Sequence, residues 1–327
     1  MNIAIRVDLS SSSGTGHFYR SSLLARKLFS YGHSVSFYLP NCDLEIDEFL
    51  DDHNDFLIVL DDFLHSTRNY DWLIIDSYII DIDWEIQARA LTSRILKIDD
   101  LCQINTSANM IINTNLHISS KDYQLIANPD CKLLLGPKFF LFRDEFLLKK
   151  HTKNLNSNYV HIFFGGNDHH QLTSHYSKLI LQNFSSLKLC IVASKFYSDK
   201  QGLLNLFTEY KDRVILHIDP SSMAETMTYC HLAFGAPGIT TWERAYMSLP
   251  SAYISTHVSQ HKILEELNKI KFCKYFGSYK DQNNELFLEC FQSFYKNKTL
   301  QNKMKDLYKN LFDDMGGERI INAMQDY

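Results

Sequence analysis

The sequence has no long hydrophobic run and no excess of basic residues. No apolar stretch approaches the roughly 20 residues that span a membrane. The opening residues Met-Asn-Ile-Ala-Ile-Arg lack the charged start and apolar core of a signal peptide. The formal net charge of the 327 residues is -5, which leaves no basic field to hold nucleic acid or an anionic membrane. We therefore expect a cytoplasmic protein with no membrane span and no nucleic-acid partner.

Paired cysteine motifs are absent as well. The seven cysteines are scattered along the chain, and none of them forms a C-x-x-C pair. An odd number of scattered cysteines is typical of reduced thiols, several of them in the core. A Walker A loop and a G-x-S-x-G nucleophile elbow are also missing, so the sequence gives no sign of either of those sites.

What the sequence does contain is an alternation of short apolar strands and helices. This order predicts an α/β protein with doubly wound parallel sheets. Strands are predicted over residues 2–7, 34–39, 72–75, 94–98 and 110–112, and again over 159–164, 187–192, 213–217, 231–234 and 251–254. The remainder of the chain is predicted to be mostly helical.

The length accommodates two domains of about 150 residues each. Residues 149–158 (KKHTKNLNSN) are polar and nearly free of apolar side chains, which makes them the predicted linker. The first domain then covers residues 1–148 and the second covers residues 159–327. Since the same plan recurs in both halves, we expect two Rossmann-like domains with a cleft between them.

Residues 6–20, RVDLSSSSGTGHFYR, are the most informative stretch. An apolar strand runs into a loop of small residues, and Gly14 and Gly16 lead into a helix whose first turn holds His17. Ligands bind at this end of a parallel strand, and the helix dipole disfavours a positive charge on the imidazole. His17 is therefore a candidate proton acceptor. The alternative is a glycine turn followed by a histidine without a special role.

A dinucleotide fold would also explain these glycines, but its G-x-G-x-x-G fingerprint is incomplete. The third glycine position is Tyr19, and the second strand ends SFYLP without the carboxylate that binds the ribose of NAD. NAD is therefore not predicted, and no other cofactor is.

Two glycine turns in the second half are candidate phosphate sites. Gly165, Gly166, Asn167 and Asp168 directly follow a predicted strand, and residues 235–243 (GAPGITTWE) join a strand to a helix. Glycine lets a backbone approach a ligand closely, and a helix start offers unpaired amides to a phosphate. Each turn taken alone is equally well explained as an ordinary connection.

The second turn carries further polar groups. Gly238, Thr240 and Thr241 stand at the predicted helix start, where amides and hydroxyls are available to a phosphate. Glu243, one turn into the helix, is a candidate ligand for a ribose diol.

No metal site is predicted. The D-x-D triplet at residues 81–83 leads into a helix for which Asp83 is the expected N-cap. His169, His170 and His175 do not share a helix face, and no cysteine joins them at ligand spacing.

Polar side chains follow three successive predicted strands of the first half. Asp76 and Tyr78 follow residues 72–75, Asp99 and Asp100 follow the next strand, and residues 113–115 (NTN) follow the third. The carboxyl ends of parallel strands meet at one edge, so these side chains face the crevice where ligands bind.

Six stretches together resemble one family, the UDP-sugar hydrolases of pseudaminic acid biosynthesis, which act on UDP-2,4-diacetamido-2,4,6-trideoxy-β-L-altropyranose. They agree in order and spacing from residue 6 to residue 250. The stretches are RVDLSSSSGTGHFYR (6–20), DWLIIDSYIIDIDWE (71–85), ILKIDDL (95–101), LLGPKFFLFRDEF (134–146), FFGGND (163–168) and GAPGITTWERAYMSLP (235–250).

The resemblance implies a two-domain fold of the GT-B glycosyltransferase type with the active site between the domains. It implies metal-independent hydrolysis at the anomeric C–O bond with inversion, with His17 as the base that activates water. Tyr78 and Asp76 would orient the sugar or the water. Other enzymes of the same sugar pathway are the implied partners. The substrate contacts expected with this assignment are Gly14, Gly16, Arg20, Gly165, Gly166, Asn167, Asp168, Gly238, Thr240, Thr241, Glu243, Ser259 and Gln260.

The sequence also departs from the family pattern. Ser259-Gln260 stands where the family has an Asn-Gln pair, and Pro237 and Ile239 replace smaller residues in the phosphate turn. These departures leave two alternatives open. One is an inverting glycosyltransferase that uses a UDP-sugar donor, and the other is a sugar-nucleotide-binding protein without turnover.

Overall fold

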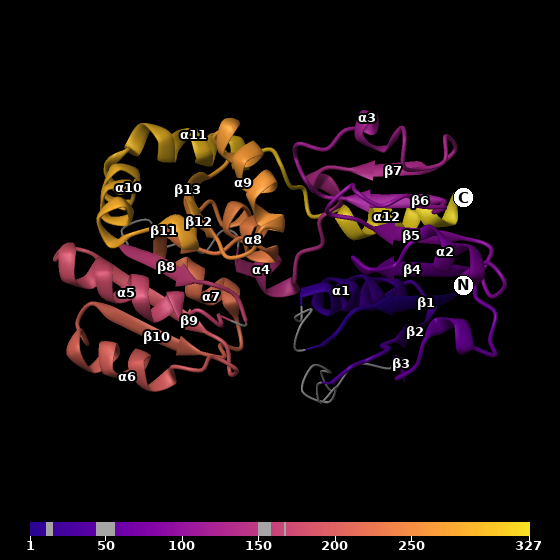
Figure 1. Ribbon diagram of the computed structural model, residues 1–327, viewed down its shortest axis with the longest axis horizontal. Helices are drawn as coiled ribbons and strands as arrows, with labels where there is room; N and C mark the ends of the chain where they lie inside the picture. The colour runs from indigo at the N-terminus through magenta and orange to yellow at the C-terminus, as the bar shows by residue number, and fades with distance from the viewer. Residues whose placement is uncertain (11–15, 44–55, 150–157, 167) are drawn as a thin grey trace. The chain divides into compact units, whose positions relative to one another are not determined.

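The structure is a computed structural model that describes residues 1–10, 16–43, 56–149, 158–166 and 168–327. The chain forms two compact units (Figure 1). Unit 1 comprises Met1–Leu141 and Asp313–Tyr327, and unit 2 comprises Phe142–Phe312. Each unit is a parallel sheet with helices on its faces, which is the predicted α/β plan.

The sheet of unit 1 has seven parallel strands in the order β3-β2-β1-β4-β5-β6-β7. Its central strand β4 is buried along its whole length, as its continuous apolar sequence predicts. The strands are β1 (Asn2–Val7), β2 (Ser34–Tyr38), β3 (Leu57–Val59), β4 (Trp72–Asp76), β5 (Ile95–Ile98), β6 (Met110–Asn113) and β7 (Lys132–Leu135).

Two apolar layers cover the faces of this sheet. Ile3, Ile5 and Val7 of β1 lie in the layer that contains α1 (Gly16–Ser30) and α12 (Gly316–Gln325). Ala4 points to the opposite layer, because successive side chains of a strand alternate between faces. The shorter helices of unit 1 are η2 (Phe63–His65), α2 (Ile82–Ala88), α3 (Ser120–Tyr123) and η3 (Pro137–Phe139).

The sheet of unit 2 has six parallel strands in the order β10-β9-β8-β11-β12-β13. The strands are β8 (Tyr159–Phe163), β9 (Lys188–Ala193), β10 (Val214–Ile218), β11 (Cys230–Gly235), β12 (Ser251–Ser255) and β13 (Lys274–Ser278). The helices are α4 (Asp144–Lys149), α5 (Leu172–Asn183), α6 (Lys200–Glu209), α7 (Met223–Thr228), α8 (Ile239–Tyr246), α9 (Ser259–Lys269), η4 (Tyr279–Asp281), α10 (Asn284–Lys296) and α11 (Lys298–Tyr308).

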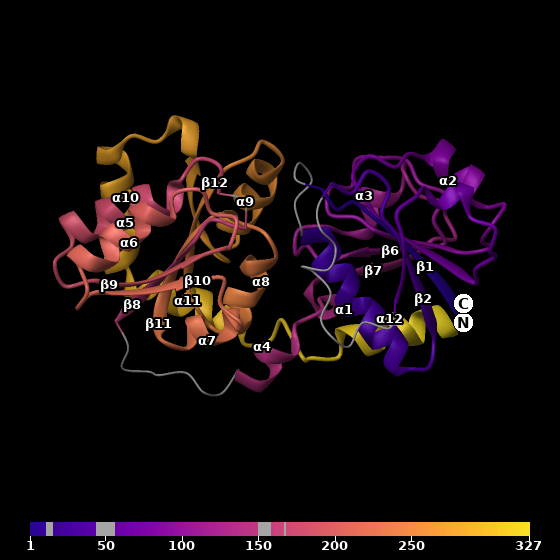
Figure 2. The same cartoon turned by 90° about the horizontal axis from the view of Figure 1, so that it is seen from below.

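The division into units differs from the predicted domains at both boundaries. Helix α12 returns to unit 1, where Ile320 and Met324 are fully buried in the core beside α1. A Cβ on Gly316 would lie 2.3 Å from the Phe140 carbonyl oxygen, so glycine permits this close approach. Figure 2 shows both chain ends at unit 1. Helix α4 belongs to unit 2, and most of the predicted linker (150–157) lies outside the described residues.

One local prediction was wrong, and three strands were missed. The helix cap at residues 81–83 is Asp81, whose side chain accepts a hydrogen bond from the Trp84 amide at 3.0 Å, whereas Asp83 lies inside α2. Strands β3, β7 and β13 were not predicted, because their sequences LIV, KLLL and KYFGS are short. The ten predicted strands are present, with ends that differ by at most one residue.

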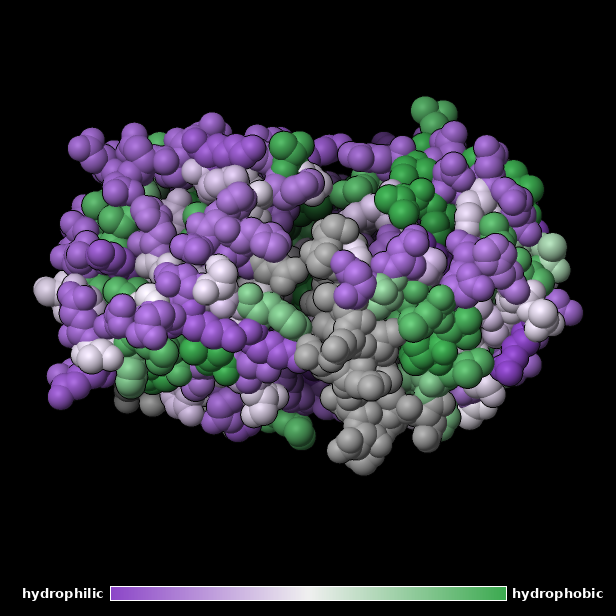
Figure 3. Space-filling view, turned by 60° about the horizontal axis from the view of Figure 1, so that its bottom comes forward, coloured by the Kyte–Doolittle hydropathy of each residue, from purple (hydrophilic) through white to green (hydrophobic). Residues whose placement is uncertain are grey.

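No helix among the described residues is long and apolar enough to cross a membrane. Hydrophilic and hydrophobic side chains are interspersed on the face drawn in Figure 3.

Candidate active site

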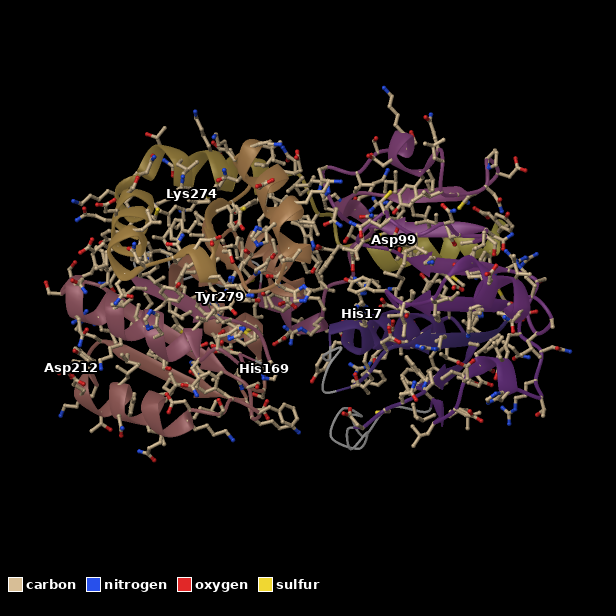
Figure 4. All side chains as sticks on the ribbon, viewed as in Figure 1. His17, Asp99, His169, Asp212, Lys274 and Tyr279 are labelled. Carbon is tan, nitrogen blue, oxygen red and sulfur yellow. The ribbon has the colours of Figure 1, made fainter. Side chains whose placement is uncertain are left out.

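The most developed cluster of polar side chains lies at the carboxyl edge of the sheet in unit 1. Helix α1 begins after β1, and β1 pairs with β4, whose last residue is Asp76. His17 therefore stands in the first turn of α1 next to the end of β4 (Figure 4). This is the edge at which the sequence predicts a site.

His17 and Asp76 form a hydrogen-bonded pair. The distance from His17 Nδ1 to Asp76 Oδ1 is 2.6 Å, and the side chains are 11% and 0% exposed, respectively. Because an ionised carboxylate only accepts hydrogen bonds, Nδ1 carries the proton in this pair. Nε2 of His17 is then left with a lone pair that can accept a proton.

Arg20 and Ser21 hold the Asp76 carboxylate from the other side. Arg20 donates from Nε to Asp76 Oδ2 at 2.6 Å and from Nη2 to Oδ1 at 2.5 Å, and the Ser21 hydroxyl donates to Oδ2 at 3.0 Å. Burial alone would raise the pKa of Asp76, but Arg20 and His17 outweigh it and hold that pKa well below its usual range. Asp76 is therefore a carboxylate at neutral pH.

A second carboxylate, Asp100, completes the cluster. Its Oδ2 accepts hydrogen bonds from Arg20 Nη1 at 2.6 Å and from the Tyr78 hydroxyl at 2.7 Å. The Tyr78 ring meets the His17 ring edge-on with centroids 4.5 Å apart. Burial and the Asp100 charge raise the pKa of Tyr78 far above its usual value, so its hydroxyl stays protonated.

The charged side chains around the His17 imidazole do not balance. Arg20 contributes one positive charge, and Asp76 and Asp100 contribute two negative charges, so one negative charge is in excess while the imidazole is neutral. An imidazolium would cancel that excess at short range. The arrangement is suited to a general base.

The structure brings together four of the predicted residues, His17, Asp76, Tyr78 and Arg20. Arg20 was predicted to contact the substrate, but its guanidinium donates to the carboxylates of Asp76 and Asp100 and so positions Asp76. Gly16 is the first residue of α1, and Gly14 lies outside the described residues. Asp100 was not predicted as a site residue, although its position after a strand was recognised.

In unit 2, the first glycine turn follows β8. Gly165 has a φ of +98°, which favours glycine, and no atom of the described, non-adjacent residues lies within 4 Å of where a Cβ would stand on Gly165 or Gly166. Asp168 accepts hydrogen bonds from the amides of Leu172 (3.0 Å) and Thr173 (2.7 Å), so both its oxygens cap α5. Asn167 lies outside the described part of the chain.

The second glycine turn leads into α8. Gly238 has a φ of +155° and open space at its Cβ position, and its amide donates to Thr241 Oγ1 at 3.1 Å. The Thr241 hydroxyl is buried and engaged, whereas Thr240 is half-buried. The turn thus leaves room for a ligand at the first amides of α8.

Glu243 is buried deeper than a ribose-binding residue was expected to be. It is 1% exposed, its Oε1 accepts from Arg143 Nη2 at 2.8 Å, and its Oε2 has no hydrogen-bond partner among the described residues. Burial raises the pKa of Glu243 despite the opposing Arg143 guanidinium. Arg143, which also pairs with Glu145 at 2.8 Å, was not predicted.

The side chains of Ser259 and Gln260 make hydrogen bonds within the loop that precedes α9. Gln260 Oε1 accepts from the amides of Thr256 (2.8 Å) and His257 (3.2 Å), and the Ser259 hydroxyl lies 3.0 Å from His257 Nδ1. These contacts order the start of α9.

Within the described ranges, no group of three or more histidine, cysteine, aspartate or glutamate side chains is placed to hold a metal ion. The ring of His170 stacks on Tyr279, with centroids 4.3 Å apart. Tyr279 and His169, which precedes His170 in the chain, can be found in Figure 4.

No protein-family model matches the chain. An uncharacterized protein of Methanocaldococcus jannaschii is 24% identical over 284 residues, which are 82% of this chain. The chain spans 58% of the length of that relative.

Solved structures share the fold over the whole chain. MurG of Acinetobacter baumannii matches with a TM-score of 0.71 and 12% identity, covering 100% of each chain. UGT89C1 of Arabidopsis thaliana complexed with UDP has a TM-score of 0.66 and 8% identity over 99% of each chain. UDP-GlcNAc 2-epimerase of Neisseria meningitidis bound to UDP-GlcNAc has a TM-score of 0.64 and 11% identity over 100% of each chain. These matches confirm the predicted fold class, two Rossmann-like domains of the GT-B type.

Proposed function

We propose that the protein hydrolyses a UDP-sugar to UDP and free sugar without a metal. The observation that carries the proposal is the His17–Asp76 pair at the start of α1. The six stretches that resemble the pseudaminic acid hydrolases support UDP-2,4-diacetamido-2,4,6-trideoxy-β-L-altropyranose or a close analogue as the substrate. The fold shared with proteins that bind UDP and UDP-GlcNAc supports the nucleotide. The enzyme would act in the cytoplasm, in pseudaminic acid biosynthesis.

His17 is the base in this mechanism. Its Nε2 takes a proton from water while the water oxygen bonds to the anomeric carbon and the C–O bond to UDP breaks, its electron pair leaving with the diphosphate. A single displacement inverts the anomeric configuration. Asp76 stabilises the imidazolium through Nδ1, and Tyr78 and Asp76 orient the reacting groups. General base catalysis of this kind contributes about 10²–10⁴-fold to the rate.

Unit 2 holds the nucleotide in this proposal. The two glycine turns bind the diphosphate. The first amides of α8 stabilise the negative charge that develops on the leaving group. Glu243 binds the ribose. This role requires its carboxylate to become accessible, because the carboxylate is buried and paired with Arg143.

An inverting glycosyltransferase is the second candidate. The same pair would then deprotonate an acceptor hydroxyl instead of water. An exposed aromatic ring beside His17 favours this reading, since Tyr78 is 41% exposed and its ring contacts that of His17. Such a surface suits the ring of an acceptor. A binding protein without turnover would need no base, and the organised His17–Asp76 pair argues against it.

The test is release of UDP without an acceptor and in excess EDTA. The altrose-configured UDP-sugar and UDP-N-acetylglucosamine are compared, and the anomeric configuration of the product is followed by NMR. Rapid release from the altrose compound with inversion is expected. UDP binding without release from either compound contradicts hydrolysis and favours the transferase.

A further inference from the structure

Unit 2 contains a buried guanidinium that forms no ion pair with a carboxylate of the described residues. Arg244, on α8, is 0% exposed. Its Nε and Nη1 have no hydrogen-bond partner within the part of the chain that the structure describes. A buried charged donor without a partner is strongly unfavourable and calls for an explanation, such as a ligand that supplies the missing charge.

The position of this guanidinium is informative. Arg244 Nη2 donates to the carbonyl oxygens of Phe163 (3.1 Å) and Phe234 (3.4 Å), at the ends of β8 and β11. A Cβ on Gly235 would stand 3.0 Å from Nη2 and 1.8 Å from the Phe163 oxygen, so only glycine fits there. Both strands continue into the two glycine turns. The positive charge therefore lies directly behind both turns, at the edge where α8 begins.

No carboxylate of the described residues forms an ion pair or hydrogen bond with Arg244, although its charge acts weakly on the neighbouring Glu243. His161 Nδ1 lies 3.4 Å from Nη2 and its Nε2 lies 3.2 Å from Thr226 Oγ1. Burial and the Arg244 charge lower the pKa of His161, so this imidazole is neutral. The Tyr253 ring lies 5.5 Å from the guanidinium carbon. The adjacent carboxylate of Glu243 is paired with Arg143 instead.

We propose that Arg244 recognises the diphosphate of the bound nucleotide through its buried charge. This inference rests on the proposed function and assigns a residue to it. Since the guanidinium is covered, Arg244 acts from behind the glycine turns, through space, and adds to the amides of α8 that face the ligand. It is a positioning residue for the anion. The diphosphate would supply a negative charge close to the guanidinium.

The test compares ligands with and without phosphate. Calorimetry with UDP, uridine and inorganic pyrophosphate is carried out on the parent and on Arg244→Met, Arg244→Gln and Arg244→Lys. The two neutral variants are expected to lose about tenfold or more in affinity for UDP and pyrophosphate, with uridine affinity unchanged within about twofold. The lysine variant is expected to recover part of the loss, because it keeps a charge.

Arg213 provides a matched control in the same unit. It precedes β10, at the opposite end of the sheet, and donates to the carbonyl oxygens of Leu187, Leu181 and Phe184. Arg213→Met is expected to bind UDP and uridine as the parent does. Circular dichroism establishes that each variant is folded, and either neutral Arg244 variant suffices for the comparison.

The outcomes separate this inference from the proposed function. A folded neutral Arg244 variant that binds UDP as tightly as the parent overturns the inference alone. Equal losses for UDP and uridine also overturn it, since they indicate a purely structural role. A parent that binds pyrophosphate in an Arg244-dependent way, but neither UDP nor uridine, contradicts the proposed function and supports the anion site.

Discussion

Replacing Asp76 by asparagine tests how the cluster makes His17 a base. The amide keeps the volume of the side chain but removes the charge that stabilises the imidazolium. At the Nδ1–Oδ1 distance of 2.6 Å, two unit charges attract by about 6 kcal/mol at an effective dielectric constant of about 20. We expect kcat to fall by about 10²–10⁴-fold, which corresponds to about 3–5 kcal/mol of activation free energy. This loss is smaller than the calculated attraction between the two charges, as it must be if the attraction is its source. UDP affinity should not change, because the nucleotide is assigned to unit 2.

The same substitution is expected to destabilise the protein. Neutralising one partner of a buried ion pair costs about 3–5 kcal/mol. We expect about 2 kcal/mol here, since Arg20 is 21% exposed and keeps its pair with Asp100. Because folding lowers the pKa of Asp76, the stabilisation is present above the unfolded-state pKa of about 4 and is lost as pH falls below it. The stability difference between parent and variant, measured by urea unfolding, should therefore shrink in acid.

The assay is UDP release under saturating substrate, at a temperature where both proteins are folded. Asp100→Asn is the matched control, because Asp100 contacts Arg20 and Tyr78 but makes no hydrogen bond to His17. We expect it to retain kcat within about tenfold of the parent. A folded Asp76→Asn variant with kcat within about threefold of the parent would refute the reasoning.

Four further predictions concern His17, Glu243 and the absence of a metal. His17→Ala should reduce turnover by about two to four orders of magnitude while UDP affinity, measured by calorimetry, stays at the parental value; unchanged turnover removes His17 from the mechanism. Glu243→Ala should weaken binding of free UDP, and equal affinity in variant and parent refutes its ribose role. Burial raises the pKa of Glu243, so its ionisation opposes folding as pH rises; Glu243→Gln should gain stability relative to the parent as pH rises above the unfolded-state pKa of about 4, measured by urea unfolding, and a relative loss contradicts this. Activity should be unchanged in excess EDTA, and loss that is restored by a divalent cation would disprove metal independence.

The sequence predicted best those elements whose own residues are enough to identify them and their place in the sheet. Strand β4 could be predicted because five consecutive buried residues form an apolar run that ends in a polar one. Its carboxyl end then predicted that Asp76 and Tyr78 face the crevice at the sheet edge where His17 was also expected. The return of α12 to unit 1 could not be predicted, because an amphipathic helix does not specify which sheet its apolar face covers.

Long-range pairings account for the site residues that were missed. Arg143 precedes its partner Glu243 by 100 residues, and neither residue alone indicates the other. Asp100 follows Arg20 by 80 residues, so its bond to that guanidinium appears only in the folded chain. The cap of α2 was misassigned for a local reason, since Asp81 and Asp83 are both good capping residues and their sequence does not separate them.

The central claim is that water activated by His17 attacks the anomeric carbon of a UDP-sugar. Turnover of the altrose-configured substrate in ¹⁸O-labelled water tests it most directly, with the mass of the released UDP as the readout. Attack at the anomeric carbon leaves the UDP unlabelled, and this is the result we predict, together with an initially inverted sugar. UDP that carries ¹⁸O on its β-phosphate would show attack at phosphorus and would contradict the account.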